Sequence, residues 1–101
     1  MDIQVTTTGN HVTVAFSGEM HVEEAAKFRE DMLELIKKSS IYFVLDMTRL
    51  KYIDSSGLGV LVALHKRALE HGGQVTIKGV NGSVKQLFEL TRLTKVFTIL
   101  P

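Results

Sequence analysis

Three neighbouring side chains that carry oxygen atoms stand where a strand pattern gives way to a helix pattern. They are Asp54, Ser55 and Ser56, and two glycines, Gly57 and Gly59, follow closely. The first backbone N–H groups of a helix lack intrahelical partners and carry partial positive charge. A serine at such a position can cap the helix, attack a substrate as a nucleophile, or accept a phosphoryl group. The expected function depends on which of these applies.

The capping interpretation needs only one of the three side chains. Asp and Ser are both preferred N-cap residues, and the glycines would then permit a tight turn. However, a glycine costs about 1 kcal/mol relative to alanine inside a helix, so two of them in the first turn indicate a second requirement. We expect small residues at Gly57 and Gly59 to keep the surface around Ser55 and Ser56 open to a partner.

A serine nucleophile is disfavoured, and we expect no enzymatic activity. The hydrolase elbow is Gly-x-Ser-x-Gly, and neither serine has a glycine two residues away on both sides. A catalytic serine also needs a base. Among the four histidines only His21 falls in a predicted loop that could come near the serines.

Phosphorylation of Ser55 would use all of these features together. It would add about −1.5 to −2 charges beside Asp54, on an open surface over a helix N-terminus. The helix end favours an anion and can hold it without unfolding the domain. A partner docked there would meet unscreened charge contacts worth roughly 1 to 4 kcal/mol each at about 4 Å. The segment therefore predicts a phosphorylation switch.

Hydrophobic periodicity predicts the elements that position this segment. An opening antiparallel hairpin and later strand–helix–strand units indicate an α/β fold with a mixed sheet, in a single domain over residues 1–101. The expected inner face of the helix after the serines comprises Leu58, Leu61, Val62, His65 and Leu69. The predicted elements are a hairpin within 1–18 that turns at Gly9-Asn10, a loop at 18–21, a helix at 22–38, a strand at 41–47, a helix at 56–71 ended by Gly72-Gly73, a strand around 75–77, a helix capped by Ser83, and a strand at 96–99.

Composition removes several classes of function. The formal net charge is +1 over 101 residues, which offers no electrostatic footprint for nucleic acid or anionic membrane. No apolar run approaches the roughly 20 residues of a membrane span, and the absence of cysteine excludes disulfides and thiolate zinc sites. The histidines are not at ligand spacing and no phosphate-binding glycine loop is present, so we expect no metal and no cofactor. The expected location is the cytoplasm.

The residues Val44–Thr48, followed by Tyr52–Gly59, closely resemble the hallmark region of STAS domains, specifically the bacterial anti-sigma-factor antagonists. The likeness continues at Phe16–Glu19, Gly72-Gly73 and Ser83–Thr91. This resemblance implies a small mixed sheet with helices mainly on one face.

The resemblance also implies partner switching. In such proteins the unphosphorylated form binds an anti-sigma factor, which is also a serine kinase of the ATPase type, and thereby frees the sigma factor. Phosphorylation of the serine directly after the motif's aspartate, here Ser55 after Asp54, releases the partner, and a serine phosphatase resets the cycle. The other role open to a STAS domain is that of a scaffold or accessory module in a signalling complex or transporter.

The expected partner surface surrounds Ser55. Family members often continue Gly-Glu with Leu-Asp, whereas this chain has Met20-His21. Either the change is neutral in a surface loop, or His21, when protonated between about pH 6 and 7, attracts phosphoserine and makes the switch sensitive to pH. The expected partner-binding residues are Met20, His21, Asp54, Ser56, Gly57, Leu58 and Gly59.

Overall fold

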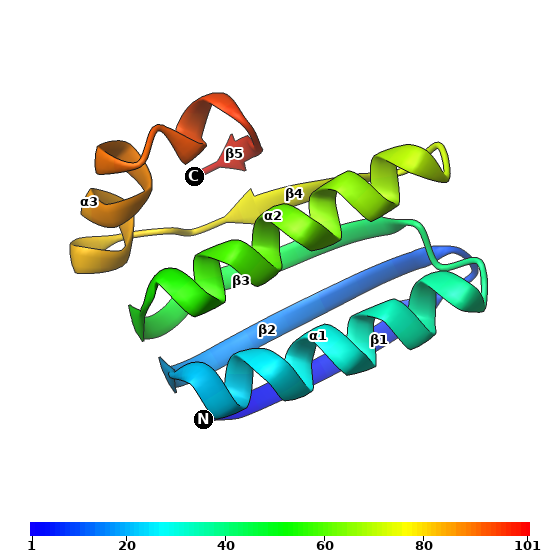
Figure 1. Cartoon of the computed structure of the whole chain (residues 1–101), viewed down its shortest axis with the longest axis horizontal. Helices are drawn as coiled ribbons and strands as arrows, with labels where there is room; N and C mark the ends of the chain where they lie inside the picture. Colours follow the sequence, from blue (N-terminus) through cyan, green and yellow to red (C-terminus); the bar gives the residue numbers. More distant parts are fainter.

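The computed structural model of the chain describes all residues, 1–101, and contains one sheet, three α-helices and a short 3-10 helix (Figure 1). The elements are β1 (Asp2–Thr8), β2 (His11–Met20), α1 (Val22–Lys37), β3 (Tyr42–Ile53), α2 (Ser55–Glu70), β4 (Gln74–Lys78), α3 (Gly82–Leu90), the 3-10 helix η1 (Leu93–Lys95) and β5 (Thr98–Leu100).

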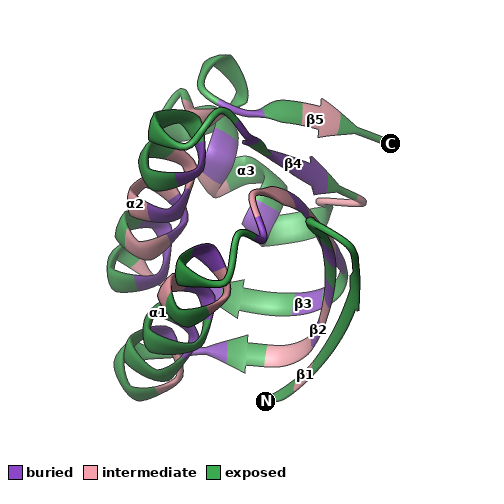
Figure 2. Ribbon diagram, turned by 90° about the vertical axis from the view of Figure 1, so that its right-hand side faces the viewer, coloured by how far each residue is buried: buried purple, intermediate pink, exposed green.

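The five strands lie in the order in which they occur along the chain. β1 pairs antiparallel with β2, and every later pair is parallel. Each crossover therefore moves one place in the same direction, and right-handed crossovers that do so place their helices on the same face. Figure 2 shows α1 and α2 side by side over one face of the sheet, while the other face is open. The predicted α/β fold, a mixed sheet with helices mainly on one face, is confirmed.

The hydrophobic core lies between this sheet and its helices and comprises 22 buried apolar residues. The buried face of α2 differs from the predicted one. Leu69 is 53% exposed and His65 is only partly covered, whereas Leu64 and Ala68 are buried. The predicted set combined two adjacent helical stripes, and the sheet and α1 cover only the one that includes Leu58, Leu61, Leu64 and Ala68.

β3 is longer than the predicted strand because two β-bulges let it continue past Met47. Its register against β2 shifts between Ala15 and Ser17 and again between Gly18 and Glu19. An extra residue at each bulge re-aims the strand, so side chains three apart can face the same side. Met47, Leu50 and Ile53 are consequently all buried. The prediction of a strand ending at Met47 is therefore wrong.

β2 is also longer than predicted: residues 18–20, expected in a loop, pair with β3 as far as Met20. At the other end of the chain, Asn81 and not Ser83 is the N-cap residue of α3. The Ser83 hydroxyl instead donates to the carbonyl of Lys51, 3.4 Å away, on the part of β3 that extends beyond β4. The last strand begins at Thr98, after Phe97 has entered the core.

Candidate functional site

The ends of β2 and β3 bring the two predicted parts of the site together. Met20 pairs with Ile53 in the parallel register, so the next residues, His21 and Asp54, leave the sheet from the same edge. His21 is the N-cap residue of α1 and Asp54 is the N-cap residue of α2. Since neighbouring strands lie only about 4.8 Å apart, the two helix N-termini form one continuous surface.

Asp54 alone caps α2. Its Oδ1 accepts a hydrogen bond from the backbone N–H of Gly57 at 3.0 Å, and the residue is half-buried. Ser55 and Ser56 are exposed, and neither hydroxyl makes a hydrogen bond within the chain. Their backbone amides belong to the first turn, whose N–H groups lack intrahelical acceptors. Helix capping therefore does not account for the presence of Ser55 and Ser56 at this position.

The two glycines of this turn have different roles. A Cβ on Gly57 would lie 2.5 Å from Cγ1 of Ile53 and 3.1 Å from Sδ of Met20, whereas a Cβ on Gly59 would meet no heavy atom within 4 Å. Gly57 is thus required because the start of α2 packs tightly on the ends of β2 and β3. The expectation that it keeps the surface open is wrong for Gly57. Gly59 is exposed, and its role in keeping the surface open to a partner stays a prediction.

Three of the residues expected to contact a partner are buried. Met20 is 0% exposed, Leu58 is 7% exposed, and Gly57 is enclosed by the packing described above. The side chains of Met20 and Leu58 pack beneath the site, so the prediction that these three residues lie on the partner surface is wrong. The prediction for Met20 failed because β2 continues through residues that were expected to form a loop. Side chains in this extension still alternate between the two faces of the sheet, and Met20 points into the core. The accessible members of the predicted set are His21, Ser56 and Gly59, with Asp54 half-buried.

Two exposed apolar side chains were missed by the sequence analysis. Val22, the first residue of α1, is 59% exposed, and Tyr52 is 42% exposed. The Tyr52 ring packs against the His21 ring with centroids 4.9 Å apart. Strand alternation was a signal that could have found it, because an apolar Ile53 facing the core turns its neighbour Tyr52 to the opposite side. These side chains supply apolar area beside the serines, which a protein partner can bury.

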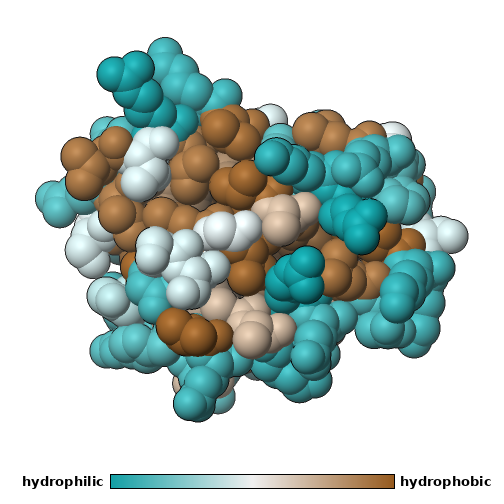
Figure 3. All heavy atoms as spheres, in the orientation of Figure 1, coloured by the Kyte–Doolittle hydropathy of each residue, from teal (hydrophilic) through white to brown (hydrophobic).

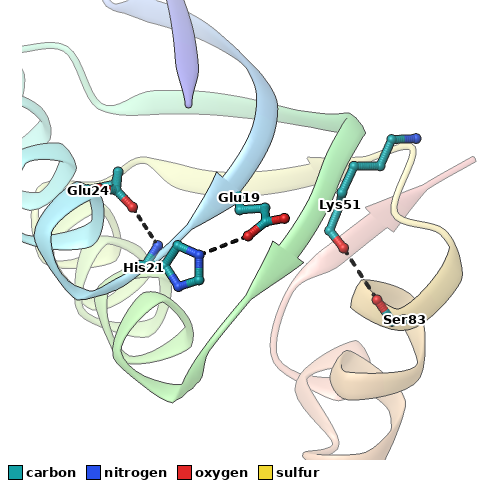
Figure 4. Close-up of polar contacts among 5 residues, drawn as sticks. All are labelled: Glu19, His21, Glu24, Lys51 and Ser83. Carbon is teal, nitrogen blue, oxygen red and sulfur yellow. Dashed lines mark hydrogen bonds and ion pairs between the residues drawn. The ribbon is translucent and has the colours of Figure 1, made fainter.

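His21 is held by two carboxylates rather than free in a loop (Figure 4). Its backbone N–H donates to Oε1 of Glu24 at 2.9 Å, and its ring Nε2 lies 2.9 Å from Oε1 of Glu19. Both side chains of the ring contact are more than half exposed. A phosphoryl group on Ser55 would have to compete with Glu19 for a protonated His21.

Asp46 and Thr48 have a structural role in the middle of β3, where its pairing with β4 ends. Oδ1 of Asp46 accepts hydrogen bonds from the hydroxyl and the backbone N–H of Thr48 at 2.6 and 3.0 Å. These bonds, helped by the nearby charges of Lys78 and Arg49, hold the pKa of the Asp46 carboxyl below its ordinary value. The Asn81 amide donates to the Thr48 carbonyl at 3.1 Å, which anchors the connection from β4 to α3.

No group of three or more His, Cys, Asp or Glu side chains is placed to hold a metal ion. None of the helices has the length and apolar character that crossing a bilayer requires. The arrangement of free hydroxyls on a helix N-terminus remains the feature to be explained.

Comparison with known proteins connects this arrangement to a family. The family model for the STAS domain matches residues 2–101. The anti-sigma-B factor antagonist of Listeria monocytogenes is 29% identical over 90 residues, which cover 89% of this chain and 79% of the relative. The anti-sigma F factor antagonist of Paenibacillus polymyxa is 32% identical over 87 residues, which cover 85% and 74%.

Among solved structures, the Bacillus cell fate determinant SpoIIAA in its phosphorylated form superposes with a TM-score of 0.80. The superposition covers 97% of this chain and 90% of that protein at 16% sequence identity, which shows a shared fold. The family match extends over nearly every residue, and the mixed sheet with α1 and α2 on one face agrees with it. The chain belongs to the STAS domain family.

Proposed function

We propose that this chain is an anti-sigma factor antagonist that acts by partner switching, with Ser55 as its phosphoacceptor. The observation that carries the proposal is the division of labour at the start of α2: Asp54 caps the helix, and the Ser55 hydroxyl is exposed and unbonded. Relatives that share about three tenths of their residues with the chain bear the name of anti-sigma factor antagonists.

The local electrostatics make Ser55 a suitable acceptor. A phosphoryl group there gains from the free N–H groups and the positive end of the α2 dipole. Asp54, next to it, contributes negative charge that adds to the field met by a partner. Two repulsive contacts of roughly 1 to 4 kcal/mol each would weaken binding by about thirtyfold or more, since about 1.4 kcal/mol corresponds to tenfold.

In this proposal the unphosphorylated surface binds an anti-sigma factor that is also an ATPase-type serine kinase. The docking area comprises the exposed residues His21, Val22, Tyr52, Ser56 and Gly59 around Ser55. Phosphorylation releases the kinase, which can then bind its sigma factor, and a serine phosphatase restores the binding form. The shared fold with SpoIIAA, solved in a phosphorylated form, supports the view that such a domain tolerates the modification.

The test is phosphate mapping with a matched pair of serine variants. The purified chain is incubated with an ATPase-type serine kinase from the same genome and ATP, and the phosphorylated residue is located by mass spectrometry. Ser55→Ala is expected to abolish labelling and keep kinase binding, whereas Ser56→Ala is expected to be labelled normally. Ser55→Asp should weaken binding with little change in stability.

Two results would contradict the proposal. Phosphate on Ser56 alone would place the switch on the wrong hydroxyl. The absence of both binding and labelling with every such kinase of the genome would favour the other role, that of a STAS scaffold or accessory module in a signalling complex or transporter.

A further inference from the structure

A groove runs between α1 and α2 on the outer side of the helical layer and begins at Val60, about one helical turn beyond Ser56. One part of it is a cavity of about 210 Å³ lined by Met32 of α1 and Leu64 of α2, among others. Half-buried Leu33, Val60 and Ala63 form its apolar walls. The hollow continues toward Ile36 and His71 at the far ends of the two helices.

The groove is long enough for a helix. From Val60 to Glu70 of α2 it follows about ten residues, or roughly 15 Å at 1.5 Å per residue, which is close to three helical turns. Figure 3 views the molecule from this side and shows hydrophobic atoms exposed along the face, with hydrophilic side chains beside them. An apolar groove between two parallel helices can bind the apolar face of a third helix.

The charges on the rim are mostly positive. Arg29, Lys37, Lys66 and Arg67 line the groove, against one lining carboxylate, Glu70. Lys37 is paired with Glu34, and Arg67 with Glu70. Arg29 on α1 and Lys66 on α2 make no ion pair, so each wall of the groove carries one cation without a partner. The chain as a whole has a formal net charge of only +1, so this excess is local.

We propose that the groove between α1 and α2 binds an acidic amphipathic helix of a partner protein, on a surface separate from the Ser55 site. Aliphatic side chains of that helix fill the cavity over Leu64, and its flanking carboxylates pair with Arg29 and Lys66. Charge complementarity selects the occupant, because a neutral or basic helix would leave these two cations unpaired or would repel them.

The proposal is tested with a designed probe and the full chain labelled with nitrogen-15. The probe is a synthetic peptide of about fourteen residues with leucines at helical spacing and glutamates on both flanks. Amide shifts are expected at Leu33, Val60 and Ala63. The control peptide carries lysine in place of every glutamate and is expected to bind at least about tenfold more weakly.

Variants localise the binding. The double variant Arg29→Glu with Lys66→Glu is expected to lower the affinity for the acidic peptide about tenfold or more. Ala63→Glu, which adds a carboxylate to the apolar wall, is expected to lower it by a similar factor. Lys85→Glu, on the exposed surface of α3, is the matched control and is expected to change the affinity less than about twofold. Circular dichroism melts confirm that each variant is folded.

Several outcomes would overturn the proposal: no amide shifts at millimolar peptide, equal binding of the lysine peptide, or shifts confined to residues 54–59 with none at Leu33 and Ala63. Saturable binding of decanoate without binding of the peptide would assign the groove to a fatty acid. Groove shifts that grow with protein concentration alone would assign it to a second copy of this chain. Because Ser55 labelling by kinase does not use these residues, failure here leaves the proposed function intact.

Discussion

Gly57 lies directly on Ile53, so closely that a single added methyl group would stand 2.5 Å from the Cγ1 atom of that side chain. The contact joins the last residue of β3 to the first turn of α2, with Met20 of β2 on the other side. It sets the height of the helix over the sheet and therefore the position of both serines.

Gly57→Ala is expected to destabilise the chain, by about 1–3 kcal/mol, because the core beneath it is already filled. Gly59→Ala is the control, since its Cβ meets no atom and an alanine in a helix is favoured by up to about 1 kcal/mol. Urea unfolding of the two variants should give shifts of opposite sign. Equal stabilities would show that α2 can move away from β3 at no cost.

Asp54→Ala is expected to cost about 1 kcal/mol of unfolding free energy, because it removes the acceptor for the Gly57 amide. Asp54→Asn should retain most of the stability, since its side-chain oxygen can accept the same bond. Ser55→Ala and Ser56→Ala should unfold at the wild-type urea concentration, because neither hydroxyl is bonded. A loss in either serine variant similar to that of Asp54→Ala would mean that the serine also caps the helix.

The environment of His65 predicts that the folded chain loses stability in mild acid. Burial lowers the pKa of this histidine below its usual 6.5, its Nδ1 has no hydrogen-bond partner, and its ring packs 5.0 Å from the ring of Phe97. The unfolded chain therefore takes up a proton at His65 more readily than the folded chain. The contribution of a neutral His65 to the free energy of unfolding is complete above pH 6.5 and decreases as the pH falls below that value.

The measurement is urea unfolding at a series of pH values from 7.5 to 5. His65→Leu is expected to lose less stability over this range than the wild type, because it contributes no proton uptake on unfolding. Identical slopes in the wild type and His65→Leu would rule out His65 as the source.

His21 offers a test of whether the switch responds to pH. If protonated His21 attracts a phosphoryl group on Ser55, the residual affinity of the phosphorylated chain for its kinase should differ between pH 6 and pH 7.5. His21→Gln should reduce that difference to the part that the phosphoryl group itself produces, since its second pKa is about 6. Glu19→Gln removes the carboxylate that competes with the phosphoryl group for the His21 ring. Fluorescence anisotropy with labelled kinase measures all three. If His21→Gln keeps the full pH effect, then His21, at a position where family members often have aspartate, does not make the switch sensitive to pH.

Local patterns were sufficient to predict the order of elements and the serine turn, because alternation, helical spacing and capping residues act over a few neighbours. The hairpin at Gly9-Asn10 and the Asp54 segment are examples. The missed features depend on contacts between distant segments. The bulges that bury Met47, Leu50 and Ile53 follow from pairing with β2. The role of Gly57 follows from the packing of three elements, and the groove beside Leu64 exists only once α1 and α2 are placed together.

The single bond from Asp54 to the Gly57 amide has a kinetic consequence for any cycle of modification at Ser55. Adding or removing a group on the neighbouring oxygen breaks no contact of the native state, so neither enzyme must wait for the domain to open. The turnover of the kinase and phosphatase, and not the rate of local unfolding, would then set how fast a cell could reverse the signal.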